Sequence, residues 1–553
     1  MSGSREPMPA CARLNSYLTP RRAKAVDNNI KGILMKLARS IRPVASLPVR
    51  FDFLSSGGKA AGRSRTRSFR RIAWCTAFAW ACTSGVAMAQ GDANAGANAD
   101  AARDASKANE AAGADTGKAA ASETGFWNRD QMFGDMGGLR PWLGKYGVSF
   151  ALTETSELLG NLRGGLARGA AYDGVTTATV QLDTDKAFGL PGGQFNVSAL
   201  QIHGGNFSGD KLGTLNTASG IEAENSTRLW ELWYQQSFLN KRIDVKVGQQ
   251  SIDQEFISST YSALFINTMF GWPALPTYDM PSGGPAYPLS ALGVRVRGQI
   301  TPSLTALAGV FDGDPLGNNP NNRSGTNFNL HNGTLFIGEL QYAINQPADS
   351  DTPPAASTAG GGLPGTYKIG VWYNNGHFAD QRYDSNGVSL ASPASTGVAA
   401  NHRGDYSFYA VADQMIWRPN PSEARSLGVF ARVMGAPGDR NLVSVAANLG
   451  VVLKAPFAGR DNDSVGLALT YIKIGSHAHG IDQDNLAFSG GPYGVRTSET
   501  ALEATYQYQI APWWMLQADA QYTFNAGAGQ NPNDPTKPLR NTFVVGLRTN
   551  ITF

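Results

Sequence analysis

One feature constrains the fold of this chain more than any other: apolar and polar residues alternate with period two from Tyr146 to Phe553. The alternation comes in segments of about 9–15 residues separated by clusters of Gly, Pro, Asn and Asp, which is typical of β-strands joined by turns. Each segment is long enough to cross a bilayer as a tilted strand, which takes about 9–11 residues. The sixteen predicted strands are 146–157, 172–187, 193–203, 228–239, 243–252, 290–300, 304–312, 333–344, 366–376, 405–418, 426–436, 441–455, 464–475, 498–510, 513–525 and 541–553.

The connections between these segments distinguish a membrane barrel from a large soluble β-protein. Counted from the first strand, the odd-numbered connections are mostly long: 204–227, 253–289, 313–332, 377–404, 476–497 and 526–540. Several even-numbered ones are tight: 240–242, 301–303 and 511–512. Long loops on one rim and short turns on the other are typical of an outer-membrane barrel, although 345–365 and 437–440 break the rule. A soluble propeller would show a blade repeat, and none is present.

The last segment shows two distinct faces and ends on an aromatic residue. One face carries Phe543, Val545, Leu547, Ile551 and Phe553, and the other carries Thr542, Gly546, Arg548 and Asn550. The alternation alone does not decide whether the apolar face meets lipid or a protein core. Phe553 at the end resembles the C-terminal signal by which outer-membrane barrels are recognised for assembly. Aromatic residues near strand ends could form interfacial girdles, namely Trp513, Trp514, Phe238 and Trp417.

A mean hydropathy of −0.25 excludes a protein built of many apolar helices. We therefore predict an all-β fold, a transmembrane antiparallel β-barrel of about sixteen strands over residues 146–553. A short N-terminal amphipathic helix is expected in 123–145, a periplasmic or plug segment, before a glycine-broken stretch at Gly137-Gly138.

Residues 1–89 are predicted to be an N-terminal extension and signal peptide. They hold 16 Lys+Arg against 3 Asp+Glu, and five arginines between 63 and 71 precede the apolar run Ile72–Ala89. The small-residue end Ala87-Met88-Ala89 predicts cleavage before Gln90 and export towards the outer membrane. Met35 is an alternative start of translation. The mature chain would then hold no cysteine, and residues 90–122, with 14 alanines, would form a low-complexity linker.

The longest connection, 253–289, has too many aromatic residues for a loop that lies in water. We expect it to fold into the barrel and to narrow the lumen, with Trp272, Tyr278 and Asp279 as candidate residues of the constriction. Prolines and glycines between Met280 and Pro288 would stiffen and turn it. A surface loop that packs on itself is the alternative.

Charged residues follow on the strands that flank this loop. Arg295 and Arg297 share the face opposite Val294 and Val296, and by the same alternation Glu231, Trp233, Asp244 and Lys246 point inward. Acid and base facing each other across a narrow pore offer many hydrogen-bond partners, which suits sugar hydroxyls. The alternative is that these charges only pair with one another and keep the lumen wet.

Two groups of residues carry a resemblance to the carbohydrate-selective porin family (the OprB type). The first is Trp127-x-Arg129, Gly134-Asp135-x-Gly137-Gly138-x-Arg140, Leu143 and Gly147. The second is Phe270-Gly271-Trp272-Pro273, Pro281-Ser-Gly-Gly-Pro-x-Tyr287-Pro288 and Ala291-Leu-Gly293-Val-Arg295. The resemblance implies a sixteen-stranded barrel in the outer membrane of a Gram-negative bacterium that admits glucose and related sugars by passive diffusion. A constriction of inward arginines and a folded-in loop is implied for Arg295, Arg297 and 253–289 alone.

Motifs of enzymes and metal sites are missing from the sequence. It contains no Gly-x-Ser-x-Gly elbow and no phosphate-binding loop. His477 and His479 are too few for a metal site, so we expect them to be solvated loop residues. We predict a channel without cofactor, metal or nucleic-acid partner, whose partners are small neutral carbohydrates, outer-membrane lipid and, as an option, further copies of itself. The alternatives are a porin for another small solute, a plugged structural barrel and an outer-membrane enzyme such as a lipase.

Overall fold

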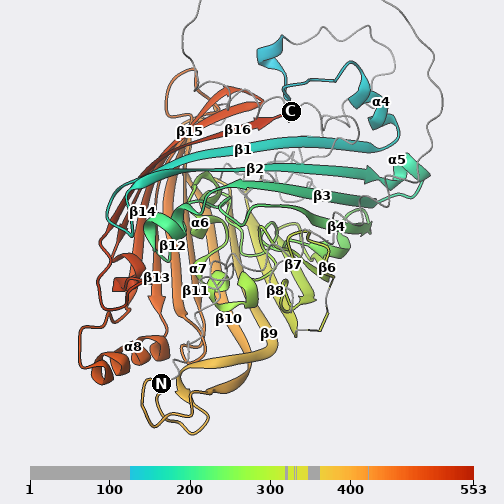
Figure 1. The fold of residues 1–553 in the computed structure, drawn as a ribbon. Coiled ribbons are helices and arrows are strands. Elements are labelled where there is room, and N and C mark those ends of the chain that lie inside the picture. Colours follow the sequence, from blue (N-terminus) through green and yellow to red (C-terminus); the bar gives the residue numbers. More distant parts are fainter. Residues whose placement is uncertain (1–124, 318–321, 329, 332, 347–361, 421–422) are drawn as a thin grey trace, which may run out of the picture. The chain divides into compact units, whose positions relative to one another are not determined.

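Sixteen antiparallel strands form one closed barrel in the computed structural model, which describes residues 125–553 except 318–321, 329, 332, 347–361 and 421–422 (Figure 1). Every strand pairs with its neighbours in the sequence, and β1 closes the barrel against β16. The strands are β1 (Val148–Arg163), β2 (Gly169–Asp183), β3 (Gly193–Gly204), β4 (Ser226–Phe238), β5 (Ile243–Gln250), β6 (Ala291–Gln299), β7 (Leu304–Asp312), β8 (Thr334–Ile344), β9 (Gly365–Asp384), β10 (Ala399–Trp417), β11 (Ser426–Gly435), β12 (Val443–Lys454), β13 (Ser464–Ile474), β14 (Ser498–Ala511), β15 (Trp514–Phe524) and β16 (Thr542–Thr552). The prediction of a barrel with sixteen strands is confirmed.

Most strand limits agree with the prediction within a few residues, and the larger differences have local causes. The predicted strand 172–187 is too long because Asp183 caps a helix: its carboxylate accepts the N–H of Asp185 at 2.9 Å and of Lys186 at 3.3 Å. In the other direction, β9 and β10 continue far into the predicted loop 377–404. Polar residues occupy both faces of this extension, so it shows no apolar alternation.

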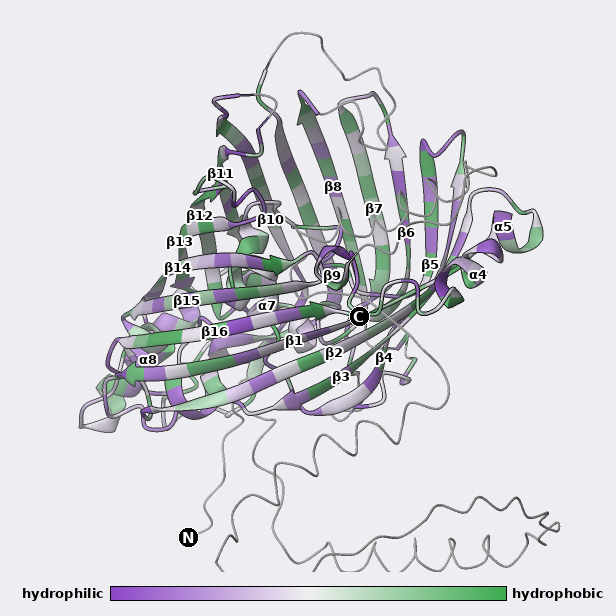
Figure 2. Ribbon diagram, turned by 90° about the horizontal axis from the view of Figure 1, so that it is seen from above, coloured by the Kyte–Doolittle hydropathy of each residue, from purple (hydrophilic) through white to green (hydrophobic). Residues whose placement is uncertain are grey.

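Side chains of the wall are arranged opposite to those of a soluble protein. On β16, Leu547 is 50% exposed on the outside of the barrel, whereas Arg548 is 2% exposed on the inside. Figure 2 shows the corresponding alternation of hydrophobic and hydrophilic bands along the strands. The apolar face therefore lies on the outside of the barrel and the polar face points to the lumen, as in a membrane barrel. Phe238 and Trp417 are exposed as expected for a girdle, but Trp513 is buried.

Two short helices precede the first strand: η2 (Phe126–Asn128) and α4 (Leu139–Lys145). The expected order, an amphipathic helix and then the glycine pair, is wrong, because α4 begins only after Gly138, which adopts a left-handed conformation. The stretch between the helices consists of turns. Trp127 stacks on Trp513, and Phe126 packs against the same ring at a tilt, which explains why that indole is buried.

The connections hold the remaining helical turns. They are α5 (Thr184–Phe188), the π-helical turn η3 (Ser208–Leu212), η4 (Ser262–Leu264), α6 (Thr268–Gly271), α7 (Ala274–Asp279), η5 (Pro281–Gly283), α8 (Ser476–Ser489) and η7 (Ala526–Gly529). Within the described part of the chain, no helix is both long and apolar enough to span a membrane.

Candidate functional site

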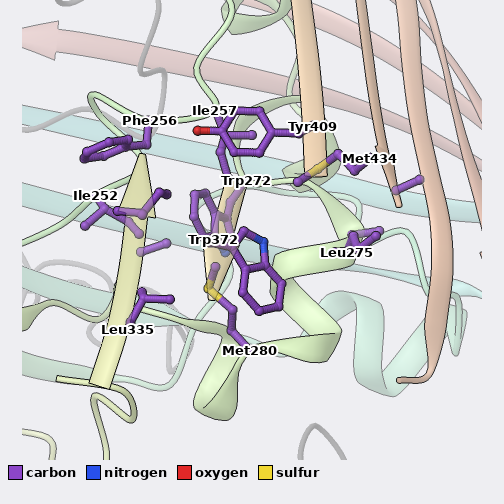
Figure 3. Packing of buried hydrophobic residues seen from close by; sticks show 14 of the residues in the cluster. Ile252, Phe256, Ile257, Trp272, Leu275, Met280, Leu335, Trp372, Tyr409 and Met434 are labelled. Carbon is purple, nitrogen blue, oxygen red and sulfur yellow. The ribbon is translucent and has the colours of Figure 1, made fainter. Parts of the chain in front are cut away.

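Loop 253–289 packs against the inner wall of the barrel. Its buried side chains, among them Trp272 and Met280, form one apolar cluster with inward residues of the strands, such as Trp372 of β9 and Tyr409 of β10 (Figure 3). A second cluster joins Leu264, Phe265 and Phe270 of the loop to Phe430, Val452 and Ala468 of the wall. The expectation that the loop folds into the barrel agrees with these contacts, and the hydrophobic effect holds it there.

Inward carboxylates of three strands bind backbone N–H groups of this loop. On β8, Glu339 accepts the N–H of Ile257 at 2.8 Å. On β10, Asp413 accepts from the Ser259 hydroxyl at 2.7 Å and from the N–H groups of Thr260 and Tyr261, both at 3.1 Å. On β14, Glu503 accepts from Ile266 and Asn267 at 2.6 and 3.0 Å. The loop thus follows the wall from strand to strand.

Arg432 of β11 makes the complementary contact with loop carbonyls. Its guanidinium is 2% exposed and donates to the carbonyl of Ile257 at 2.9 Å. It also donates to the carbonyls of Met269, Phe270 and Gly271 at 2.7, 2.9 and 3.1 Å, at the end of α6. Because a guanidinium presents five donors in a fixed fork, one side chain joins two distant segments of the loop.

A second loop, 205–225, also folds inward, and we did not predict this from the sequence. Phe207, Leu212 and Ala218 pack on Leu159 of β1 and Val544 of β16. The apolar residues of this loop carried the same signal as the aromatic residues of loop 253–289, but more weakly. The two loops touch, since Tyr278 and Tyr287 of loop 253–289 donate their hydroxyls to the carbonyls of Leu215 and Ile221 at 2.6 and 2.9 Å.

Most predicted charged residues form one group on β4, β5 and β6. In the β5–β6 register Lys246 lies opposite Arg295, and Asp244 lies opposite Arg297. Arg295 pairs with Asp244 and donates to Gln235 at 3.0 Å, and it is only 3% exposed. Arg297 lies 3.4 Å from Asp244 and keeps 38% of its side chain exposed. In this arrangement the side chain of Arg297 is partly exposed to solvent, whereas that of Arg295 is buried.

Glu255 of loop 253–289 completes this group and was missed from the sequence. Arg295 donates to it at 3.0 Å, and Lys246 forms an ion pair with it. Burial raises the pKa of Glu255, but the charges of Lys246 and Arg295 outweigh burial and lower the pKa to about 2. No strand pattern points to Glu255, because it lies in a loop whose path depends on tertiary contacts.

Glu231 and Trp233 lie on the same wall. Glu231 accepts the N–H of Ser251 at 3.1 Å, where the chain leaves β5, and Lys246 lies 4.4 Å from the centre of the Trp233 ring. The Trp233 face is therefore covered by a cation instead of being open to a sugar ring.

Trp272, Tyr278 and Asp279 lie apart from the charged group. Trp272 belongs to the apolar cluster and donates its Nε1 to the Gly283 carbonyl at 2.8 Å. Asp279 accepts the N–H of Val443 on β12 at 3.2 Å, and burial raises the pKa of its carboxyl well above the usual range. These three residues attach the loop to its surroundings.

The histidines expected to be solvated have partners. His477 and His479 lie on α8, where the Nδ1 of His477 is 2.9 Å from Asp380 of β9 and the Nδ1 of His479 is 2.6 Å from the Arg496 carbonyl. His402 of β10 contacts the same carboxylate at 2.9 Å. In the residues that the structure describes, no three His, Cys, Asp or Glu side chains are grouped to hold a metal ion.

Comparison with known proteins agrees with this architecture. The family model described as "Carbohydrate-selective porin, OprB family" matches residues 167–553. Porin B of Pseudomonas aeruginosa is 25% identical over 461 residues, which cover 79% of this chain and 94% of that protein. The putative porin QuiX of Acinetobacter baylyi is 24% identical over 454 residues, covering 77% and 94%.

A solved structure has the same fold. The high-pH structure of Pseudomonas putida OprB superposes with a TM-score of 0.67 at 23% identity, and the match covers 78% of this chain and 100% of that one. The family model spans most of the barrel, and Porin B matches over nearly its whole length. The chain therefore belongs to the OprB family of carbohydrate-selective porins and is a sugar porin of the outer membrane.

Proposed function

We propose that small neutral sugars diffuse passively along a path bounded by the two inner loops and by the charged group on β4, β5 and β6. The observation that carries this proposal is the partial exposure of that group on the inner wall: Arg297 keeps 38% and Glu255 keeps 23% of its side chain exposed. Gln235 and Lys246 beside them are also partly exposed.

The chemistry of these side chains suits hydroxyl groups. A carboxylate accepts hydrogen bonds only and a guanidinium donates only, whereas each sugar hydroxyl does both. The group contains three bases, Lys246, Arg295 and Arg297, which form ion pairs with Asp244 and Glu255. The opposite charges therefore largely cancel, and the group offers little attraction to a strongly charged solute. Arg295 is buried and bound by Asp244, Gln235 and Glu255, and we therefore assign the contact with sugar to Arg297, with Arg295 as its support.

Conductance in a planar bilayer tests this function. Wild-type protein is expected to conduct ions, and glucose is expected to reduce the conductance in a saturable way. Arg297→Gln should weaken the block, while Arg323→Gln, a change at an exposed arginine paired with Glu224 at 3.6 Å, should leave it unchanged. Conductance indifferent to glucose would favour a porin for another small solute.

A plugged structural barrel is the second candidate. It is favoured by the burial of most inward side chains near the two loops, including Glu339, Arg432 and Glu503. A folded barrel that carries no current would establish this alternative and contradict the porin mechanism.

Export through a cleaved signal peptide is part of the proposal, although residues 1–124 lie outside the described part of the chain. The signal pattern that ends at Ala89 supports cleavage before Gln90. N-terminal sequencing of protein from outer membranes should begin at Gln90, and a start within 1–89 would contradict it.

The molar mass of the protein in detergent decides between a single barrel and a homo-oligomer.

A further inference from the structure

The two inner loops meet along a line of hydrogen bonds, which we call the seam (217–220 with 266–268). Gly220 donates its N–H to the Ile266 carbonyl at 2.9 Å, and Thr268 donates its N–H to the Thr217 carbonyl at 3.1 Å. The Thr268 hydroxyl adds a bond to the Ser219 carbonyl at 2.6 Å. Backbone of one loop thus pairs with backbone of the other, although about fifty residues separate them in the sequence.

Gln521 of β15 binds both sides of the seam. Its Nε2 donates to the Ala218 carbonyl of loop 205–225 at 2.8 Å, and its Oε1 accepts from Asn267 Nδ2 of loop 253–289 at 3.0 Å. Gln521 lies directly opposite Glu503 of β14, which accepts two N–H groups of loop 253–289. Gln521 also donates to Asp519 at 2.9 Å, so its amide orientation is defined.

Glu499 holds loop 205–225 from the same strand as Glu503. The carboxylate is completely buried and accepts four N–H donors: Leu215 N at 3.1 Å, Asn216 N at 2.6 Å, Asn216 Nδ2 at 2.7 Å and Gly527 N at 2.6 Å. Glu499 and Glu503 are four positions apart on β14, so both point inward and lie about 13 Å apart along the strand. One strand therefore carries an attachment for each loop.

We propose that Glu499 and Gln521 are positioning residues that hold the two loops together as one fixed constriction. This inference rests on the proposed function, in which both loops bound the path of the sugar. Four donors occupy the Glu499 carboxylate, and both amide protons of Gln521 are used, so a different arrangement of the loops would break these buried bonds. The two loops consequently stay joined as one filter, and the pore is not gated by their separation from each other.

Substitutions that remove these bonds at nearly constant volume test the inference. Glu499→Gln leaves one acceptor where four donors converge, so two N–H groups lose their partner. Gln521→Leu removes the bonds to Ala218 and Asn267 on the two sides of the seam, together with the bond to Asp519. Each variant is expected to show a several-fold rise in single-channel conductance, stronger current noise and a weaker glucose block in a planar bilayer.

Matched controls change the same chemistry elsewhere. Glu224→Gln alters an exposed carboxylate of loop 205–225, and Gln201→Leu alters an exposed glutamine of β3 that makes neither contact. Both should behave as wild type. Glu499→Asp, which keeps two acceptors on a shorter side chain, should fall between wild type and Glu499→Gln.

The outcomes separate this inference from the proposed function. Unchanged conductance and noise in Glu499→Gln or Gln521→Leu barrels that show normal heat-modifiable migration on gels would overturn the inference, whatever glucose does. If wild type conducts but ignores glucose, the sugar function fails, while a rise in variant conductance still supports the joined filter. If Glu499→Gln does not assemble, Gln521→Leu decides, because it removes three bonds of a neutral side chain and leaves those of Glu499 in place.

Discussion

Arg295 on β6 and Glu255 on loop 253–289 are joined by a hydrogen bond of 3.0 Å between Nη2 and Oε1. This contact connects the wall of the barrel with the loop that enters it. The same arginine pairs with Asp244 of β5, and the same glutamate pairs with Lys246. Opposite charges on neighbouring elements thus fix the point at which the loop leaves the wall.

The first prediction concerns the charge of Glu255. Glu255→Gln leaves Lys246, Arg295 and Arg297 with Asp244 as their remaining acidic partner, so the inner wall gains net positive charge. We expect a shift of the reversal potential in a salt gradient towards anion selectivity, and a weaker glucose block. Asp210→Asn, at an exposed acid of loop 205–225, is the control. Unchanged ion selectivity would show that Glu255 does not face the conducting path.

The second prediction concerns Arg432, which binds four loop carbonyls. Arg432→Met removes these bonds and leaves buried carbonyl groups without donors, at a cost of about 1–3 kcal/mol for each group that finds no water. The barrel strands do not depend on these bonds, so we expect an assembled barrel with higher conductance and current noise. Arg432→Lys should be closer to wild type in conductance and current noise than Arg432→Met, because an ammonium group still donates to three acceptors. If Arg432→Met has the conductance and current noise of the wild type, the apolar clusters alone hold the loop.

The sequence was sufficient for the barrel because membrane strands obey a local rule. Leu547 faces outward and Arg548 faces the lumen, and strands of a membrane barrel repeat that alternation. The rule fails where apolar residues no longer alternate with polar ones: β9 runs on to Asp384 through His377 and Asp380, which place polar side chains on both faces of the strand. The alternation therefore predicts this strand too short.

The site was predictable only in part, because its composition depends on contacts between distant segments. Inward positions of Arg295, Asp244 and Lys246 followed from alternation along single strands. Glu255 and Glu499 did not, since one lies in a loop and the other acquires its role from donors in loop 205–225. The period-two pattern indicates whether a side chain points inward or outward, but it does not indicate which loop packs against that side chain.

The third prediction uses the pH dependence of loop 205–225. Burial raises the pKa of Glu222 to about 7, the charges of Asp173 and Glu157 add to this, and the hydrogen bonds from Ser208 oppose it. Because the pKa of Glu222 is higher in the folded loop than in the unfolded one, the folded loop is most stable at pH values below the pKa of the unfolded state. This stability is lost as the pH rises through about 7. We expect current noise to increase with a midpoint near pH 7.

A variant identifies the group responsible for this titration. Glu222→Gln should abolish the midpoint near pH 7, since the carboxamide has no proton to lose. Glu255 offers the opposite case: its pKa of about 2 means that its stabilising charge is present at higher pH and is lost only as pH falls towards 2. Glu255→Gln should therefore leave the midpoint in place. A midpoint that survives in Glu222→Gln would assign the titration to another group.

The last prediction concerns the closure of the barrel by the segment before β1. Arg140 of α4 donates to the carbonyls of Phe150 and Phe553 at 2.7 and 2.6 Å, and its guanidinium lies 4.3 Å from the centre of the Phe150 ring. Hydrogen bonds of charged groups contribute about 1.5–3 kcal/mol each, so Arg140→Ala should lower the free energy of unfolding by about 3 kcal/mol. Conductance should not change, because α4 packs beside the start of β1 (Figure 1). Urea unfolding in detergent measures the effect, with Lys145→Ala as the control on the same helix, and equal stability of the two variants would contradict a role for Arg140 in fastening the two ends of the barrel.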